Sequence, residues 1–159
     1  MLLVLSLRKE SVSMNKILVF VVIVPVIALL MFKGIFFYEY DTKQRYIKDL
    51  IDSTAYEVKI TGVLTTDEYA GLKTKLNSFG KFDDTGIILK KGTYVDGSLS
   101  NLTAYNLNTR LNKGDAFLIY VKSSNVSNYS RIQNGGVSAD DTENLYYKAK
   151  AQCRVEFIQ

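Results

Sequence analysis

The side chains best suited to catalysis or metal binding are scarce in this sequence. The 159 residues include no His and one Cys, Cys153. Nucleophile systems in which a His activates a Ser or Cys therefore cannot form, and the His and Cys ligand sets of common zinc and iron–sulfur sites are missing. No phosphate-binding glycine loop and no G-x-S-x-G motif occurs. We expect a protein that is not an enzyme, with no catalytic residue, cofactor, metal site or small-molecule substrate.

Three other features of the sequence could suggest catalysis, metal binding or cysteine chemistry. Asp67 and Glu68 follow Thr65, where they fit the start of a helix better than general acid catalysis. The acidic cluster ADDTE (139–143) lacks the alternating oxygen ligands and central glycine of a calcium loop. Cys153 falls on the apolar side of an alternating pattern, so we expect it to pack in the core, with redox chemistry or lipid attachment as the alternatives.

Charge is unevenly distributed along the chain. Residues 1–38 hold four of the 20 basic residues and one of the 16 acidic residues, so residues 39–159 are close to neutral. The basic excess therefore flanks an apolar segment. Nucleic-acid binding needs Lys and Arg gathered on one face of the folded part. We expect no nucleic-acid partner.

Residues 17–38 form the apolar segment, ILVFVVIVPVIALLMFKGIFFY, in which Lys33 is the one charged residue. As a helix it would extend about 33 Å, which matches a hydrocarbon core of about 30 Å. No small-residue cleavage site of the signal-peptide type follows it, so we expect an uncleaved anchor in the lipid bilayer. Pro25 is tolerated inside a membrane helix, and Lys33 suits the interface at the end of the span.

The expected topology is a plasma-membrane protein with a single span. We expect residues 1–16 to be a cytoplasmic tail, residues 17–38 the transmembrane helix and residues 39–159 an extracytoplasmic domain. Basic residues lie on both sides of the span, so charge alone does not decide the orientation. Whether the chain starts at Met1 or at Met14 also stays open.

The chain after the span predicts an α+β domain. Apolar residues recur at helical spacing from Ile47 to Val58, so the membrane helix should continue as an amphipathic helix until Gly62. A second helix should start at Thr65, with Glu68 completing a capping box, and stop at Gly80. One face of the first helix then needs a cover, which a small antiparallel sheet would supply.

Three strands are predicted for this sheet. Short apolar runs indicate strands at 87–89 and 117–121, and strict alternation from Tyr147 to Phe157 indicates a half-buried third strand. The polar segment between Lys122 and Asn144 contains an Asn-Gly-Gly turn and should join antiparallel strands as an extended hairpin or mobile loop. It is either a solvated loop or a surface for a partner.

The apolar helix, the region YDTKQRYIKDLIDSTAYEVKITGVLTTDEYAGLKTKLNSFG and the closing strand YKAKAQCRVEF resemble TadE-like minor pilins, or pseudopilins, of tight-adherence pilus loci. The chain also resembles related single-pass membrane proteins of uncharacterised function in Gram-positive bacteria. The resemblance implies a non-enzymatic component of a pilus or secretion assembly with protein partners. The alternative is an anchored binding or accessory module of a conjugative or secretion locus.

The stretch KGIFFYEY (33–40) resembles the prepilin peptidase sites of tight-adherence pilins, in which a Gly precedes a Glu-Tyr pair. Such peptidases cut before an apolar segment, whereas here the apolar segment precedes Gly34. Cleavage after Gly34 would remove the anchor. We therefore expect the chain to stay uncut at this position.

Overall fold

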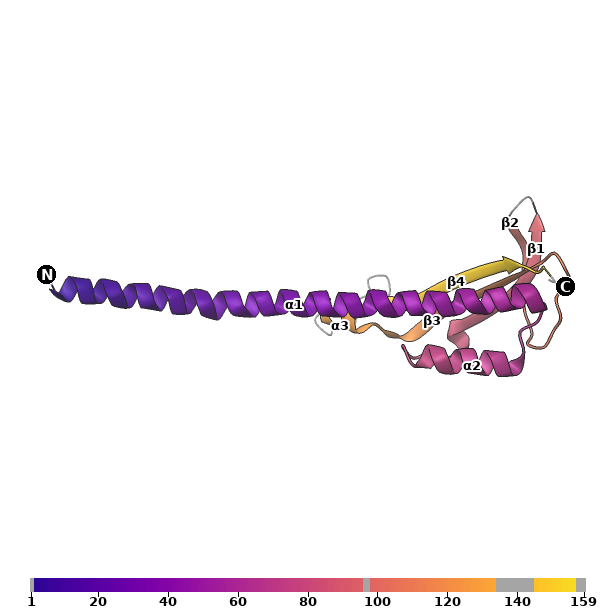
Figure 1. The fold of residues 1–159 in the computed structure, drawn as a ribbon, viewed down its shortest axis with the longest axis horizontal. Helices are drawn as coiled ribbons and strands as arrows, with labels where there is room; N and C mark the ends of the chain where they lie inside the picture. The colour runs from indigo at the N-terminus through magenta and orange to yellow at the C-terminus, as the bar shows by residue number, and fades with distance from the viewer. Residues whose placement is uncertain (1, 96–97, 134–144, 157–159) are drawn as a thin grey trace. The chain divides into compact units, whose positions relative to one another are not determined.

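The computed structural model describes residues 2–95, 98–133 and 145–156 and shows an α+β fold, as predicted (Figure 1). It combines a long helix, a short second helix and a four-stranded antiparallel sheet. The elements in chain order are α1 (Leu2–Thr61), α2 (Thr66–Asn77), the 3₁₀ turn η1 (Asp84–Gly86), β1 (Ile87–Val95), β2 (Ser98–Ala104), β3 (Asp115–Val126), α3 (Asn128–Gln133) and β4 (Tyr146–Arg154).

The chain forms two structural units, Met1–Tyr38 and Glu39–Gln159, and α1 contributes to both. In the first unit, α1 includes Pro25, and the apolar side chains from Ile17 onward are exposed. A stretch of α1 within Lys16–Thr61 reaches a mean hydropathy of 2.7 over 18 residues, with none of them buried. By length and composition, this helix could cross a membrane.

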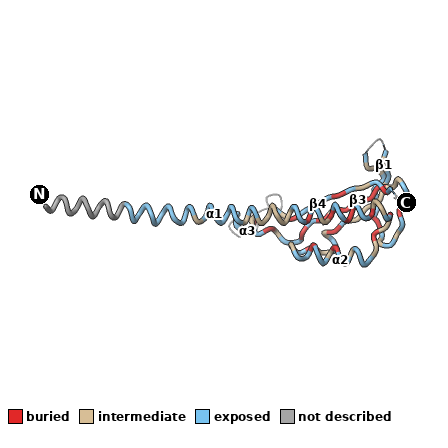
Figure 2. The backbone as a smooth tube through the Cα atoms, in the orientation of Figure 1, coloured by how far each residue is buried: buried red, intermediate tan, exposed pale blue. Residues whose placement is uncertain are grey.

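The second unit is built around one face of α1. Ile47, Ile51 and Val58 are fully buried and pack with α2 and the inner side of the sheet in a single core. Figure 2 shows the buried stretches on the strands and on the part of α1 within this unit. Burying an aliphatic side chain of this size contributes about 1.5–3 kcal/mol. The predicted apolar face, which included Leu50 and Thr54, is confirmed, with Leu50 half-buried at its margin.

The connection from α1 to α2 follows the predicted signals. Gly62 ends α1 with φ 72°, a left-handed conformation that favours glycine. At the start of α2, the Thr65 Oγ1 accepts a hydrogen bond from the Glu68 N–H at 3.2 Å, and the Glu68 carboxylate accepts one from the Thr65 N–H at 2.8 Å. The predicted stop at Gly80 is wrong by a few residues, because α2 ends at Asn77 with Ser78 as its C-cap.

The sheet has the strand order β2-β1-β3-β4, with every neighbouring pair antiparallel. Two of the three predicted strands are longer than expected, since β1 extends to Val95 and β3 to Val126. The whole of β2 was missed. Its side chains are mostly exposed and its sequence, SLSNLTA, contains no apolar run or alternation long enough to signal a strand.

The outer edge of β4 is covered by α1. The Gln44 side-chain amide donates a hydrogen bond to the Lys148 carbonyl and accepts one from the Lys148 N–H. Further along, the Glu156 N–H donates to the Lys59 carbonyl at 2.8 Å. These bonds satisfy backbone groups that would otherwise form an open sheet edge.

A loop was predicted for residues 122–144, but the described part of this segment, up to Gln133, contains a strand and a helix. Its first residues complete β3, and Asn128–Gln133 form α3, whose Ser130 is buried. The Ser127 N–H donates to the Leu145 carbonyl, and the Leu145 N–H donates to the Ser130 Oγ, so α3 is tied to the start of β4. Residues 134–144, with the predicted turn, lie outside the described residues.

The α1 face gives the first prediction. Replacing Ile51 with Ala should lower the free energy of unfolding by about 2–5 kcal/mol, because it leaves a cavity between α1 and the sheet. The measurement is thermal or denaturant unfolding of the full chain in detergent micelles, followed by near-ultraviolet circular dichroism of the tyrosines. Asp49→Ala on the exposed side of the same helix is the control, and equal stability of both variants would contradict the packing.

Candidate functional site

The register of the sheet gathers a set of side chains on the face turned away from the helices. Strand residues alternate between faces, so the residues next in sequence to the buried inner residues point outward together. Directly opposed outer positions pair Lys122 with Lys148, and Tyr120 with Lys150. The outer face carries four lysines, one arginine and no carboxylate among the described strand positions: Lys90, Lys122, Lys148, Lys150 and Arg154.

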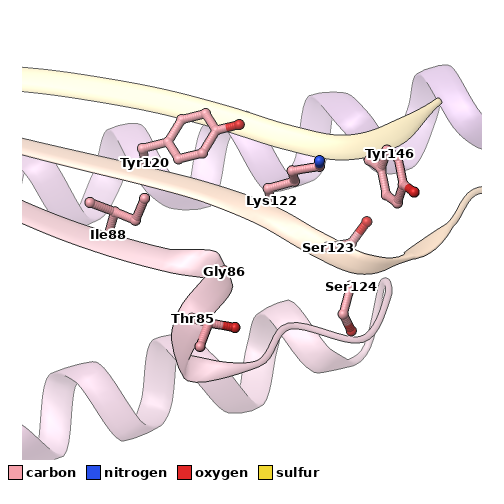
Figure 3. Close-up of a pocket in the computed structure, with 8 residues that line it drawn as sticks. All are labelled: Thr85, Gly86, Ile88, Tyr120, Lys122, Ser123, Ser124 and Tyr146. Atoms are coloured by element: carbon pink, nitrogen blue, oxygen red, sulfur yellow. The ribbon is translucent and has the colours of Figure 1, made fainter. Parts of the chain in front are cut away.

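A hollow of about 360 Å³ lies at one end of this face (Figure 3). It is formed where η1 and the start of β1 meet β3 and the start of β4. The lining residues are Thr85, Gly86, Ile88, Tyr120, Lys122, Ser123, Ser124 and Tyr146. Gly86 is required here because a Cβ at this position would lie 2.3 Å from the Lys122 carbonyl oxygen. The close approach of these two backbones sets the floor of the hollow.

The two serines of the hollow make hydrogen bonds within the protein, whereas Lys122 contacts an aromatic ring. The Ser123 hydroxyl donates to the Asn125 carbonyl at 2.8 Å and accepts from the Tyr147 N–H at 3.1 Å. The Ser124 hydroxyl donates to the Lys81 carbonyl at 3.1 Å. Both serines therefore hold β3 in place. The Lys122 Nζ lies 4.3 Å from the centre of the Tyr146 ring, a cation–π distance that positions the ammonium group over the tyrosine.

This arrangement is suited to binding a ligand. Among the described residues that line it, the ionisable side chains are one lysine and two tyrosines. An ammonium group flanked by tyrosine rings and a threonine hydroxyl can bind an anionic or hydroxyl-rich group. Sequence reasoning missed these residues, because Lys122 and Tyr146 come from segments predicted to be a loop and the margin of a strand.

A second hollow of about 500 Å³ lies beside α2 and includes Tyr69 and Asp84. The Asp84 carboxylate accepts hydrogen bonds from the Lys73 Nζ at 2.6 Å and from the Tyr69 hydroxyl at 3.2 Å. The bond from Lys73, followed by the bond from Tyr69, lowers the pKa of Asp84. The carboxylate therefore remains ionised at neutral pH and is unsuited to donate a proton.

The residues weighed from the sequence have structural roles where they are described. Glu68 caps α2, as predicted, and Asp67 lies in the first turn of the same helix. Cys153 is half-buried against the core, in agreement with the packing interpretation. The ADDTE cluster lies outside the described residues, and no group of His, Cys, Asp or Glu within the described ranges is arranged to hold a metal ion.

Tyr105 is a structural residue that the sequence did not reveal. Its ring is buried and meets the Phe117 ring edge-on at 5.3 Å. Its hydroxyl accepts a hydrogen bond from the Leu64 N–H at 2.9 Å and donates one to the Thr109 carbonyl at 2.7 Å. Desolvation by burial raises the pKa of Tyr105, which keeps the hydroxyl protonated as a donor. Tyr105 thereby joins the α1–α2 connection to the sheet.

The hollow's floor gives the second prediction. Gly86→Ala should destabilise the domain by about 1–3 kcal/mol, because the new methyl group meets fixed backbone rather than a movable side chain. Gly71→Ala is the matched control, since nothing lies within 4 Å of its Cβ position on α2. That control should stabilise the helix by about 0.5–1 kcal/mol. Unfolding of both variants in micelles measures the difference, and equal effects would contradict the close approach.

The thiol of Cys153 gives the third prediction. Desolvation by burial raises its pKa from 9.0 to about 11. At about pH 8 a smaller fraction of Cys153 is therefore thiolate in the folded protein. Cys153 should react with a disulfide reagent on the order of 100-fold more slowly in the folded protein than in denaturant. The shift stabilises the folded state below pH 9, and that contribution disappears as the pH rises through about 11. Equal rates with and without denaturant would show that the thiol is not protected.

The outer sheet face and its hollow are therefore the candidate binding surface of this protein. The cations of this face form no ion pair with any residue that the structure describes, and two tyrosines lie beside them. Comparisons with protein-family models, curated proteins and solved structures found no match to the chain.

Proposed function

We propose that this protein is a single-pass, membrane-anchored, pilin-like subunit that helps to assemble a pilus or secretion apparatus and has no enzymatic activity. The observation that carries the proposal is the composition of α1. One helix contains an uncovered apolar segment and also the fully buried face, Ile47 to Val58, around which the α+β domain is packed.

This composition suits a subunit that works by lateral association. The exposed apolar side chains of residues 17–38 need a cover, which a bilayer or the apolar helices of neighbouring subunits would supply. Because α1 is also the packing surface of the domain, its helical segment 39–61 is ordered by the core. In this proposal the domain lies outside the cell and is joined to its anchor through α1.

A second function is favoured by the hollow on the sheet. An anchored extracytoplasmic accessory module of a conjugative or secretion locus would bind its partner through a built surface, and the Lys122 and Tyr146 side chains form one. In this alternative, the apolar helix serves only as an anchor. The two functions therefore differ in which part of the chain touches other proteins.

Photo-cross-linking in living cells separates the two functions, and it is the fourth prediction. A photoreactive amino acid is placed in turn at residues 27–30, which sample all sides of the helix, and at Thr85 in the hollow. A pilus subunit should give discrete protein cross-links from at least one of the four helix positions. Cross-links from Thr85 alone would support the accessory module and contradict the pilus proposal.

Orientation is checked in the same cells with a membrane-impermeant maleimide. In a Cys153→Ala background, a cysteine at Lys113 should be labelled in intact cells, whereas a cysteine at Asn15 should be labelled only after lysis. The reverse pattern would place the domain inside the cell and contradict an extracytoplasmic domain. The mass of the purified chain also tests processing, and a product starting at Ile35 would contradict an uncut anchor.

A further inference from the structure

The end of the domain that lies next to Tyr40 and Gln44 has a distinct surface. The Tyr40 hydroxyl donates to the Tyr146 carbonyl at 3.5 Å, and its ring stacks on Tyr147 at 5.5 Å and on Tyr129 at 6.3 Å. Gln44 binds the backbone of Lys148. The start of β4 and α3 are therefore held against the first turns of α1 within the domain.

Chain connectivity keeps this end close to the apolar segment. Tyr40 is two residues and Gln44 is six residues beyond Tyr38, the last residue of the segment. Six residues span at most about 22 Å even when fully extended. If the apolar segment is in a bilayer, Gln44 therefore lies within about 22 Å of the end of that segment in any orientation of the domain.

We define the anchor-end surface by five residues of this region: Lys122, Arg131, Ile132, Leu145 and Lys148. Ile132 and Leu145 are large apolar side chains exposed to 38% and 37%. Leu145 is fixed next to α3 because its N–H donates to the Ser130 Oγ at 3.0 Å. The three cations are also exposed. Exposed aliphatic groups beside cations are typical of proteins that lie at a membrane interface.

The pairing of charges distinguishes this surface from α1 and α2. On α1, Lys43 pairs with Glu39 at 2.6 Å and Arg45 with Asp41 at 2.7 Å, so the carboxylates nearest the apolar segment are neutralised locally. Every ion pair between described residues uses a cation of α1 or α2. Within the described ranges, Lys122, Arg131 and Lys148 form no ion pair.

The positions of two of these cations are electrostatically unfavourable. Lys122 and Lys148 are directly opposite each other on β3 and β4 and point to the same face. Like charges in this relation destabilise a sheet. The Tyr146 ring under the Lys122 ammonium group offsets part of the cost. A bound anion shared by the two ammonium groups would remove the repulsion.

We infer that the anchor-end surface docks on the headgroups of anionic phospholipids, with Ile132 and Leu145 entering the interface and Lys122, Arg131 and Lys148 contacting phosphates. A lipid surface accounts for the cations, the exposed aliphatic groups and the forced proximity together. An acidic protein would account only for the cations. The inference needs the membrane anchor of the proposed function but not a role in a pilus.

The test uses the full-length chain in nanodiscs made either of phosphatidylcholine or of equal parts phosphatidylcholine and phosphatidylglycerol. Lysines are acetylated with an amine reagent and the modified positions are quantified by mass spectrometry. Lys122 and Lys148 should be modified roughly three- to fivefold more slowly in the anionic bilayer. The protection should disappear in about 1 M salt, where the Debye length is about 3 Å.

Two internal controls make the result specific. Lys75 on α2 and Lys113 before β3 are exposed, and their modification should be equal in both bilayers. An environment-sensitive fluorophore on a cysteine replacing Leu145, in the Cys153→Ala background, should shift to shorter wavelength in the anionic bilayer. The same probe replacing Lys113 should not shift.

A matched pair of double variants tests the charges. Lys122→Gln with Lys148→Gln should abolish the fluorescence shift, whereas Lys75→Gln with Lys113→Gln, which removes the same charge, should retain it. All four positions are exposed, so circular dichroism should show both variants folded. Loss of the shift in both variants would overturn the assignment to this surface.

The outcomes also separate this inference from the proposed function. A chain that fails to enter nanodiscs contradicts the anchor itself. A chain that enters both bilayers and shows equal modification of Lys122 and Lys148 overturns the lipid docking alone. Protection that occurs in native membranes but not in either nanodisc also overturns it and indicates a protein partner.

Discussion

The structure depends on the burial of one face of α1 by the sheet. Ile47, Ile51 and Val58 lose all contact with solvent, and the core that contains them also includes residues of α2 and three strands. A four-stranded sheet with one apolar side requires such a helix, because a sheet alone has nothing to cover its inner face. The same helix closes the edge of β4 through Gln44, so one element supplies both the core and the protection of the sheet edge.

Charge is arranged differently on the two sides of this core. Helix α1 carries mixed charges in pairs four residues apart, such as Glu39 with Lys43, and these pairs are locally balanced. The outer face of the sheet carries Lys122, Lys148 and Lys150 without carboxylates among its described strand positions. The expectation of no nucleic-acid partner rested on the near-neutral net charge of residues 39–159. This net charge does not show that paired charges lie on α1 while cations gather on the outer face of the sheet. Net charge describes a chain, whereas recognition depends on which charges share a face.

Patterns formed by residues close in sequence correctly predicted helix ends and a strand. The capping box at Thr65 and Glu68, the left-handed stop at Gly62 and the alternation along β4 each involve residues a few positions apart, and each agrees with the structure. The short strand β2 was missed because it contains no apolar run or alternation, and the helix α3 was missed because its stability comes from contacts distant in sequence. For α3, these are the hydrogen bonds that join Ser127 and Ser130 to Leu145. The hollow was missed for the same reason, since Gly86, Lys122 and Tyr146 meet only after the sheet forms.

The sequence by itself determined the apolar segment of residues 17–38, the α+β class and the amphipathic face of α1, because hydrophobic periodicity is a property of neighbouring residues. It also excluded chemistry that needs a His, since none is present. Only the tertiary structure decided which strands are adjacent and in which register. That register places Lys122 opposite Lys148 and brings Tyr146 beneath Lys122. Strand pairing joins residues that are far apart in the chain, so no local pattern encodes the surface that they form.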